Sequence, residues 1–388
     1  MSTTGPRIVM IAGEASGDAL GAGLAHSLKK ARPNIELAGI AGPAMQSAGV
    51  EAWHDLDELS IMGLTEIIRH LPRLFALRRK LKKRILDWQP DVFVGIDAPE
   101  FNLGLSRQLR RRGQRTAHYV APTVWAWRPG RTVTVARSTD LLLTLFPFEP
   151  ALFRAHGLPS RFVGHVLADD IAASPRLLEK RTQATRHADE PTPPHVVLLP
   201  GSRNGEIERH ARLLADTALW LRNRQPAMTI RILLAHDSQK KLLNSMAGEQ
   251  LARAGARIVC GRTRSEMAAA DVAISASGTA TLEAFLLECP LVVYYRLTPA
   301  SYFLLRTFRL IQSPFIALPN ILQGRSVAPE FVQQAAQPQA LGQAALDWID
   351  NAGRRQVYQQ VAARCREELA AGASDNAASA LLELIDKE

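Results

Sequence analysis

The chain of 388 residues has few cysteines, no long hydrophobic run and no recognisable leader segment. Its three cysteines, Cys260, Cys289 and Cys365, are odd in number and widely spaced, which excludes a disulfide framework or a zinc cluster and favours a reducing cytoplasm. No apolar run reaches the roughly 18 residues of a membrane-spanning helix, so we expect no such helix. Residues 1–13 carry neither a basic segment nor a small-residue cleavage motif, so we expect no secretory signal.

Motifs for metal and serine hydrolase chemistry are also missing. The sequence has no H-E-x-x-H, no C-x-x-C and no acidic triplet, so we expect neither a metal site nor a cofactor. It has no G-x-S-x-G, which excludes a serine hydrolase of that type. With 47% hydrophobic and 22% charged residues, the composition is that of a globular protein with a full core rather than a disordered or collagen-like chain.

Positive charge exceeds negative charge. The 47 Lys and Arg residues against 37 Asp and Glu residues leave a net charge of +10, which favours polyanionic partners such as nucleic acid, anionic lipid or phosphorylated substrates. Residues 69–84 hold eight of these positive side chains and no acidic one, and five arginines follow within residues 107–115. The first stretch lacks interleaved aromatics for base stacking and no nucleic-acid-binding module is present, so we do not expect nucleic acid as a partner.

Short apolar runs alternate with helical patterns, which is typical of a parallel sheet covered on both faces. Strands are predicted at residues 7–12, 35–40, 91–97, 115–122, 140–147 and 161–165, and then at 195–200, 229–236, 257–260, 271–275 and 291–296. We therefore predict an α/β fold of two doubly wound halves: an N-terminal domain of residues 1–171, a Pro-rich linker of residues 172–194, and a C-terminal domain of residues 195–388 with a helical tail. Such sheets bind ligands beyond the carboxyl ends of their strands, so we expect the site in the cleft between the halves.

The first polar motif follows the first predicted strand. Residues 12–18 read Ala-Gly-Glu-Ala-Ser-Gly-Asp, where glycine lets the main chain approach a ligand and a helix N-terminus favours anionic or hydroxyl-bearing groups. The structural alternative is a tight turn in which Ser16 or Asp18 caps the helix.

The second motif, residues 95–102, follows the third predicted strand. Asp97 stands at the end of this apolar strand, where burial can raise the pKa of its carboxyl toward that of a working base. Glu100 and Asn102 are near enough to hydrogen-bond a sugar or to orient Asp97. The alternative is that Asp97 only caps the next helix.

Two further motifs lie in the second half. Residues 199–206 run from a strand through Gly201, Ser202 and Arg203 into a helix, an arrangement in which main-chain N–H groups and a guanidinium meet a phosphate. Residues 275–284 pass from a strand through small residues into a helix, where hydroxyls and N–H groups can hold a diphosphate and Glu283 can accept hydrogen bonds from ribose hydroxyls. The alternative for both is a small-residue turn with a helix cap.

The basic stretch is also amphipathic. Apolar residues recur at helical spacing and alternate with arginines, an arrangement suited to the surface of an anionic membrane. The alternative is a helix that packs on the core with a solvated basic side, and Pro72 predicts a kink or two short helices. The predicted membrane-contact residues are Leu64, Ile67, Ile68, Leu71, Arg73, Phe75, Arg78 and Arg79.

Several motifs together point to one family. They are Ala-Gly-Glu-Ala-Ser-Gly-Asp at 12–18, Gly-Ile-Asp-Ala-Pro-Glu-Phe-Asn at 95–102, Tyr-Val-Ala-Pro-Thr-Val-Trp-Ala-Trp at 119–127, Leu-Pro-Gly-Ser-Arg at 199–203, the 275–283 segment and Leu-Pro-Asn at 318–320. Across residues 7–325 and in this order, they closely resemble the lipid-A-disaccharide synthase family.

The resemblance implies a GT-B glycosyltransferase of two Rossmann-like halves, with the nucleotide sugar in the second. It implies metal-free transfer from UDP-2,3-diacylglucosamine to the 6-hydroxyl of 2,3-diacylglucosamine 1-phosphate, which gives a β-1′,6-linked disaccharide 1-phosphate and UDP. It also implies a peripheral enzyme on the cytoplasmic face of the inner membrane of Gram-negative bacteria, held to an anionic surface. The oligomeric state stays open.

The resemblance also implies residue roles. Asp97 is the candidate base for an inverting, in-line displacement. By the same resemblance, the departing UDP is stabilised by Gly201, Ser202 and Arg203 and by the helix start with Ser277, Gly278, Thr279 and Thr281. Glu283 binds the ribose hydroxyls, and Asn320 contacts the nucleotide or the donor sugar. The residues expected on the acceptor-binding side are Glu14, Ser16, Asp18, Glu100 and Asn102.

Two other functions remain as alternatives. The nearest is another UDP-sugar enzyme of the GT-B type, such as a lipid II glucosaminyltransferase or a UDP-N-acetylglucosamine 2-epimerase. The first would be expected to have a different glycine-rich loop near the N-terminus, and the second to have more acidic and histidine groups. A nucleic-acid-binding protein is the alternative of a different class.

Overall fold

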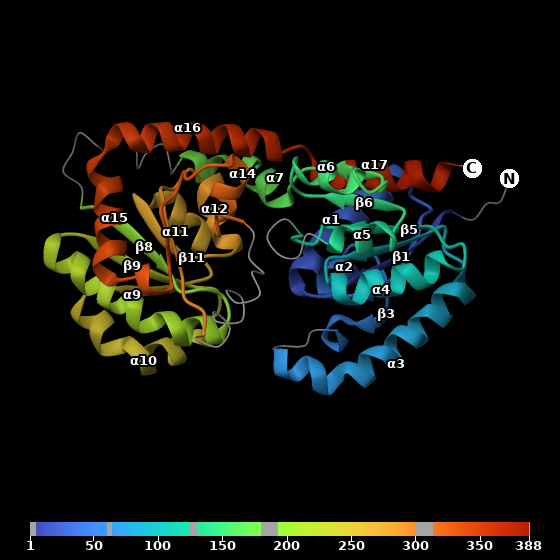
Figure 1. Cartoon of the computed structure of the whole chain (residues 1–388), viewed down its shortest axis with the longest axis horizontal. Helices are drawn as coiled ribbons and strands as arrows, with labels where there is room; N and C mark the ends of the chain where they lie inside the picture. The colour runs from blue at the N-terminus through green and yellow to red at the C-terminus, as the bar shows by residue number, and fades with distance from the viewer. Residues whose placement is uncertain (1–4, 60–63, 125–129, 180–192, 299–312, 388) are drawn as a thin grey trace. The chain divides into compact units, whose positions relative to one another are not determined.

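The computed structural model describes residues 5–59, 64–124, 130–179, 193–298 and 313–387 and forms two α/β units (Figure 1). Unit 1 comprises Met1–Asp169 together with Leu369–Glu388, and unit 2 comprises Asp170–Glu368. Each unit contains one sheet, and every strand pairing in the described residues is parallel. The predicted fold class is therefore confirmed.

Unit 1 has a seven-stranded sheet in the order β3-β2-β1-β4-β5-β6-β7. The strands are β1 (Arg7–Ala12), β2 (Glu36–Ala41), β3 (Glu51–Asp55), β4 (Val92–Ile96), β5 (Thr116–Tyr119), β6 (Leu141–Thr144) and β7 (Ser160–Phe162). The helices are α1 (Ala15–Ala31), α2 (Pro43–Ser47), α3 (Leu64–Trp88), α4 (Pro99–Arg110), α5 (Arg131–Ala136), α6 (Glu149–Arg154), the start of α7 (Val166–Ala172), and α17 (Ala373–Asp386).

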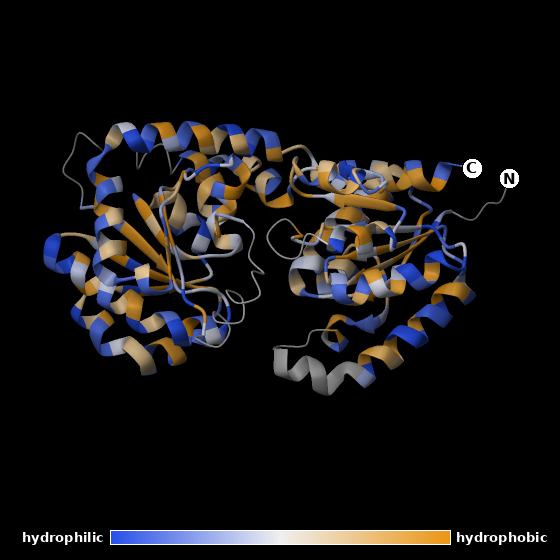
Figure 2. Ribbon diagram, viewed as in Figure 1, coloured by the Kyte–Doolittle hydropathy of each residue, from blue (hydrophilic) through white to orange (hydrophobic). Residues whose placement is uncertain are grey.

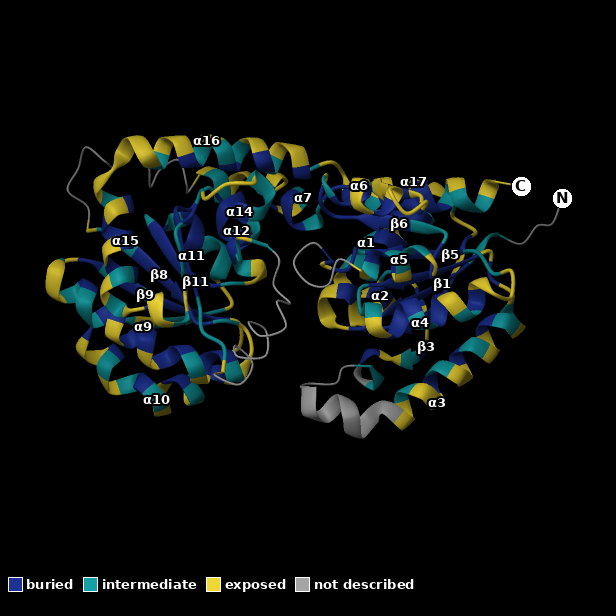
Figure 3. Cartoon of the chain, viewed as in Figure 1, coloured by how far each residue is buried: buried dark blue, intermediate teal, exposed yellow. Residues whose placement is uncertain are grey.

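The core of unit 1 lies on both faces of its sheet. Successive side chains of a strand point to opposite faces. Accordingly, Ile8 and Met10 of β1 pack with α1 and α17, whereas Val9 and Ile11 pack with α3 and α4. Figure 2 shows hydrophobic colours along the strands, and Figure 3 shows the same strands as buried. Burial on both faces explains why these strands read as continuous apolar runs.

Unit 2 has a six-stranded sheet in the order β10-β9-β8-β11-β12-β13. The strands are β8 (His195–Leu199), β9 (Thr229–Leu234), β10 (Arg257–Cys260), β11 (Val272–Ala276), β12 (Leu291–Tyr295) and β13 (Glu330–Val332). The helices are α9 (Asn204–Arg224), α10 (Gln239–Arg253), α11 (Thr263–Ala269), α12 (Thr279–Leu286), α14 (Leu318–Gln323), α15 (Pro338–Asp350) and α16 (Ala352–Leu369).

The structure differs from the sequence prediction at the sheet edges. The sequence reading missed β3 and β13, which are edge strands of their sheets. The other two edge strands, β7 and β10, are predicted from the sequence. β3 reads Glu-Ala-Trp-His-Asp and β13 is only Glu-Phe-Val, so neither contains the apolar run that marks a strand.

The predicted domain limits also need correction. The predicted C-terminal domain of residues 195–388 includes the whole helical tail, but α17 belongs to unit 1 and packs against α1. Asn376 Nδ2 donates to Val163 O at 3.0 Å, and Arg115 Nη1 donates to Ile385 O at 2.6 Å. Within the predicted linker of residues 172–194, residues 175–179 are helical, and residues 180–192 lie outside the described part of the chain.

Candidate functional site

Asp97 directly follows β4, at the carboxyl end of the sheet of unit 1. Asp97 and Ala98 both adopt left-handed backbone conformations, with φ of 51° and 42°. Such a conformation costs about 1–3 kcal/mol for a residue other than glycine, and it persists only where neighbouring groups hold it. The chain enters α4 at Pro99, so this strained pair turns the strand directly into the helix.

Asn102 supplies part of that support. Its buried Nδ2 donates to the carbonyl oxygens of Asp97 at 2.9 Å, Ile11 at 3.1 Å and Ile96 at 3.3 Å, and so ties the ends of β1 and β4 together. Of the two predicted roles, the structure therefore supports orientation of Asp97. With a fully buried side chain, Asn102 is not placed to contact a sugar directly.

The environment of Asp97 suits a proton acceptor. Burial raises the pKa of the Asp97 carboxyl above its ordinary value, the hydrogen bond from the Ala98 N–H opposes this rise, and the negative charge of Glu14 adds to it. Gly13 lets the chain before Glu14 pass close to the Asp97 turn. A Cβ at position 13 would lie only 2.3 Å from the Ala98 Cβ, so only glycine permits this approach. A carboxylate with a raised pKa is a stronger base near neutral pH.

The other predicted acceptor-side residues separate into exposed and buried ones. Glu14 and Ser16 are exposed at the start of α1, and Glu100 is exposed and pairs with Arg131 at 2.8 Å. Asp18 is buried, and its carboxylate accepts hydrogen bonds from the N–H groups of Gly42, Ala44 and Met45 at 2.9 to 3.1 Å. Asp18 thus caps the start of α2, and its role on the acceptor side stays a prediction.

Glu206 of unit 2 has no role in the sequence prediction. Its Oε2 accepts hydrogen bonds from the N–H groups of Ser202 at 3.0 Å and Arg203 at 3.3 Å. These are the N–H groups that the sequence reading assigned to a phosphate. Because Glu206 occupies these N–H groups, the turn presents the exposed side chains of Ser202 and Arg203 to a ligand.

The start of α12 is partly committed to internal contacts. Ser277 Oγ donates to Ile316 O at 2.8 Å, and Thr281 Oγ1, which is buried, donates to Gly278 O at 2.7 Å. Gly278 and Thr279 are exposed at the N-terminus of the helix. Main-chain N–H groups and the helix dipole make this end suitable for an anion.

Two predicted nucleotide contacts have protein partners. Glu283 accepts a hydrogen bond from Arg264 Nε at 2.7 Å, and Arg264 also pairs with Asp170 at 3.4 Å. Sequence reasoning missed Arg264, because no local motif surrounds it. Asn320 is buried, and its amide bonds to Val327, Ala328 and Glu330, so its side chain has internal partners, and its predicted ligand contact stays a prediction.

The predicted membrane segment forms one helix, α3, of 25 residues that includes Pro72. The side chains of Leu64, Ile67, Ile68 and Leu71 lie outside the described part of the structure. Farther along, Phe75 is 61% exposed, and Arg73 and Arg79 are exposed. Arg78 lies over the rings of Phe75 and Phe101, at 5.7 and 5.0 Å from their centroids.

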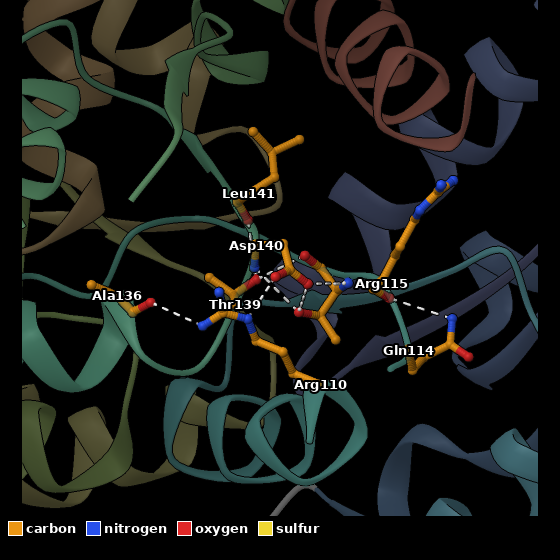
Figure 4. A network of polar contacts seen from close by, with 8 residues as sticks. Arg110, Gln114, Arg115, Ala136, Thr139, Asp140 and Leu141 are labelled. Atoms are coloured by element: carbon orange, nitrogen blue, oxygen red, sulfur yellow. Dashed lines mark hydrogen bonds and ion pairs between the residues drawn. The ribbon is translucent and has the colours of Figure 1, made fainter. Parts of the chain in front are cut away.

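Part of the second basic cluster has internal partners. Figure 4 shows Arg110 beside Asp140, where Nε and Oδ1 are 2.5 Å apart, and the same carboxylate accepts hydrogen bonds from Thr116. Arg115 donates to main-chain oxygens of α17 and the residue after it. Arg110 and Arg115 therefore tie elements of unit 1 together, whereas Arg107, Arg111 and Arg112 of the same cluster are exposed.

No group of three or more His, Cys, Asp or Glu side chains among the described residues is arranged to hold a metal ion. Among the same residues, no helix has both the length and the apolar composition to cross a membrane.

Comparisons with known proteins cover nearly the whole chain. The family model for lipid-A-disaccharide synthetase matches residues 8–385. A lipid-A-disaccharide synthase of Chromohalobacter salexigens is 42% identical over 379 residues, which are 98% of this chain and 97% of that protein. One from Xanthomonas campestris pv. campestris is 44% identical over 393 residues, which are 98% of this chain and 86% of that protein.

Solved structures share the fold at low identity. UDP-GlcNAc 2-epimerase from Neisseria meningitidis, bound to UDP-GlcNAc, has a TM-score of 0.65 at 12% identity and covers 97% of this chain and 100% of its own. A ugt transferase from Siraitia grosvenorii in complex with UDP has a TM-score of 0.61 at 11% identity, over 99% and 100% of the two chains. At such identities the likeness concerns the fold alone, and it agrees with two Rossmann-like units of the GT-B type.

Proposed function

Because the chain belongs to the lipid-A-disaccharide synthetase family, we propose a specific reaction for it and roles for its residues. The chain is a glycosyltransferase of lipid A disaccharide synthesis, and its substrates are a lipid A precursor sugar nucleotide and an acceptor. We assign the donor as UDP-2,3-diacylglucosamine and the acceptor as 2,3-diacylglucosamine 1-phosphate. The products are then the β-1′,6-linked disaccharide 1-phosphate and UDP.

The proposed chemistry is one in-line displacement, because an α-linked donor that gives a β-linked product inverts the anomeric carbon. The acceptor 6-hydroxyl oxygen attacks this carbon, and the bond from the carbon to the β-phosphate oxygen of UDP breaks. Asp97 takes the proton of the attacking hydroxyl. This role is supported by the position of Asp97. Its partly buried carboxyl has a raised pKa, and it stands on a left-handed turn at the end of β4 that Asn102 holds by a hydrogen bond.

We place the donor at unit 2. The exposed Arg203 guanidinium and the N-terminus of α12 at Gly278 and Thr279 would stabilise the negative charge that develops on the departing β-phosphate. Glu283 would accept hydrogen bonds from the ribose hydroxyls, and Arg264 would hold Glu283 in place for them. Ser277 and Thr281 would shape this loop through their internal hydrogen bonds.

We place the acceptor at unit 1, near Glu14, Ser16 and Glu100, which are exposed around the Asp97 turn or on the helix that follows it. We also propose that the exposed face of α3 holds the enzyme to the anionic cytoplasmic surface of the inner membrane. Support comes from Phe75, a large apolar side chain that is 61% exposed beside exposed arginines.

The alternative UDP-sugar functions have less support. The relatives at 42% and 44% identity are named lipid-A-disaccharide synthases. The epimerase structure matches at 12% identity, which supports a shared fold alone. The family membership therefore favours disaccharide synthesis over a lipid II glucosaminyltransferase or an epimerase.

The experiment is to measure UDP release from UDP-2,3-diacylglucosamine in detergent, with and without 2,3-diacylglucosamine 1-phosphate and with and without EDTA. We expect release by the native chain to need the acceptor and to be insensitive to EDTA. In Asp97→Asn, release should fall by about 10²–10⁴-fold, the usual contribution of a general base, while UDP binding is kept. In the native chain, kcat/KM should fall as the pH drops through the raised pKa of Asp97, because protonation removes the base.

The matched control is Asp91→Asn, at the other end of β4, where Asp91 accepts a hydrogen bond from the Arg7 N–H that an Asn oxygen can keep. This variant should retain activity. A folded native chain without acceptor-dependent release would overturn the assigned reaction, and an active Asp97→Asn would move the base elsewhere.

A further inference from the structure

A carboxylate occupies the turn that sequence reasoning assigned to the donor phosphates. Glu206, in the first turn of α9, is 8% exposed, and its Oε2 accepts the N–H groups of Ser202 and Arg203 at 3.0 and 3.3 Å. We call residues 201–203 the phosphate turn. The N–H groups of the phosphate turn are arranged as in an anion-binding site, but the group that they bind is the carboxylate of Glu206.

The same carboxylate is held on its other side. Tyr295, the last residue of β12, donates its hydroxyl to Glu206 Oε1 at 3.2 Å. Gly201 has φ of +111°, and a Cβ there would lie 2.4 Å from Glu206 Oε2. Only glycine allows the carboxylate to lie so close to the turn, so the glycine serves the Glu206 contact in this structure.

Other elements bind the carbonyl groups around the phosphate turn. Gln239 Nε2, at the start of α10, donates to Ser202 O at 2.7 Å. His210, which is buried on α9, has a lowered pKa because of its burial, so its ring is neutral near neutral pH. Its Nδ1 donates to Pro200 O at 2.8 Å, and its Nε2 accepts the Arg296 N–H at 3.3 Å. Contacts from α9, α10 and the end of β12 therefore hold this main chain in place.

Two consequences follow for a bound diphosphate. Its oxygens would compete with an ionised carboxylate for the same two N–H groups, and like charges at such distances repel each other. The Arg203 side chain, by contrast, is exposed and can form a charge-assisted, two-pronged contact with a phosphate.

We infer that Glu206 and Tyr295 are positioning residues for Arg203. Glu206 binds the N–H groups of the phosphate turn and Tyr295 holds Glu206, so that at this turn the Arg203 guanidinium, and not the main chain, receives the donor diphosphate. This inference rests on the proposed function, because it takes a UDP-sugar as the ligand of unit 2. Glu206 and Tyr295 thereby gain roles that the sequence motif did not indicate, and of the two phosphate contacts that the motif predicts, only the guanidinium remains.

The test is UDP affinity, measured by calorimetry on the full chain without acceptor, so neither Asp97 nor turnover is involved. Glu206→Ala should weaken UDP binding by about tenfold or more, because two hydrogen bonds to a charged acceptor are lost and the turn is released. Glu206→Gln should stay within about threefold of the native chain, because its amide oxygen can accept both N–H groups. Tyr295→Phe should have an intermediate effect.

A double-mutant cycle shows whether Glu206 acts through Arg203. Arg203→Ala alone should weaken UDP binding, and adding Glu206→Ala should then cost less than about twofold more, because the positioned group is already absent. In the assay with substrates, Glu206→Ala should raise the KM for the donor and leave the KM for the acceptor unchanged. Glu208→Ala, which removes an exposed carboxylate from the same helix, is the matched control and should bind UDP like the native chain.

Three results would overturn the inference. Tighter UDP binding by Glu206→Ala would mean that the carboxylate only occupies a main-chain phosphate site. Additive losses in the cycle would mean that Glu206 does not act through Arg203. Equal losses in Glu206→Gln and Glu206→Ala would mean that charge matters and not the hydrogen bonds, and the Gln variant keeps this comparison open if the Ala variant unfolds. A native chain that binds no UDP would instead overturn the donor site of the proposed function and this inference with it.

Discussion

Burial separates the acidic residues of three strand-end motifs, Asp18, Asp97 and Glu206, into different roles. Asp97 is only partly buried, and its pKa is raised, so it is suited to accept a proton. Asp18 and Glu206 are 4% and 8% exposed, and each accepts several main-chain N–H groups. A carboxylate that satisfies several buried donors stabilises a turn, and its removal leaves those donors without partners.

Asp18→Ala should therefore lower the free energy of unfolding of unit 1 by about 2–4 kcal/mol, because three N–H groups at Gly42, Ala44 and Met45 lose their acceptor. Chemical denaturation measures this change. Ser16→Ala, at an exposed position of the same helix, is the control and should change stability by less than about 0.5 kcal/mol. An unchanged stability together with a raised acceptor KM would instead restore Asp18 to the acceptor side.

His118 predicts a pH dependence of stability. It is fully buried on β5 beside Gly95 and Asn102, neither ring nitrogen has a hydrogen-bond partner among the described residues, and burial lowers its pKa from 6.5 to about 3. Between these values the unfolded chain binds a proton that the folded chain does not. Stability should therefore fall as the pH decreases from about 6.5 toward 3, by up to about 1.4 kcal/mol per pH unit from this residue.

His118→Phe should remove that part of the dependence, because phenylalanine does not titrate. Urea denaturation at several pH values between about 4.5 and 7.5 measures the slope for both chains. His165, whose pKa burial lowers to about 4, contributes a similar slope in both and is the internal reference. Equal slopes in the native chain and the variant would contradict the prediction.

At the scale of elements, α3 has two parts with different surroundings. Leu77, Leu81 and Ile85 pack in the core of unit 1, as expected for a helix that covers a sheet. Phe75 is exposed instead, with Arg73 and Arg79 exposed nearby. One helix thus packs on the sheet through one set of residues and exposes another, and the proposed membrane contact concerns only the exposed set.

Replacing both exposed arginines, Arg73→Gln with Arg79→Gln, should weaken binding to vesicles that contain anionic lipid by about 2 kcal/mol, or roughly 30-fold, at low salt. Phe75→Ser should weaken it further, because the apolar insertion is lost. Vesicle co-sedimentation measures both effects. Arg212→Gln, an exposed arginine of α9 in unit 2, is the matched control. Equal binding to neutral vesicles, or binding to duplex DNA at physiological salt, would contradict the proposed membrane surface.

At the scale of the whole chain, the C-terminus completes the N-terminal unit. Helix α17 packs on α1, where Ser27 Oγ donates to Asp375 Oδ1 at 2.6 Å. Arg32 pairs with Asp386 at 2.5 Å near the end of the same helix pair. The core of unit 1 therefore includes residues of α17, far from the rest of this unit in the sequence.

Deletion of residues 373–387 should destabilise unit 1, because the apolar face of α1 becomes exposed to water. Hydrogen exchange followed by mass spectrometry should show faster exchange in α1, and in β7 near Val163, whose carbonyl loses the Asn376 contact. Peptides of α9 in unit 2 should keep their native protection. Loss of protection in α9 with an unchanged α1 would contradict the assignment of α17 to unit 1.

The sequence by itself determined the fold class, the central strands and the motif that holds Asp97. These features are local: buried parallel strands read as short apolar runs, and polar residues follow directly where a strand ends. The sequence did not indicate β3, which is mostly polar, or β13, which has three residues, because neither contains an apolar run.

Only the tertiary structure decided which polar groups meet, because their separation in sequence is large and no local pattern records it. Asp18 reaches the Gly42 N–H 24 residues away, the Glu206 carboxylate meets the Tyr295 hydroxyl 89 residues away, and Ser27 meets Asp375 across 348 residues. Each contact assigned a residue to a turn or a unit that its own neighbourhood in the sequence did not indicate. A carboxylate's role depends on its burial and its donors, and both are set when the chain folds.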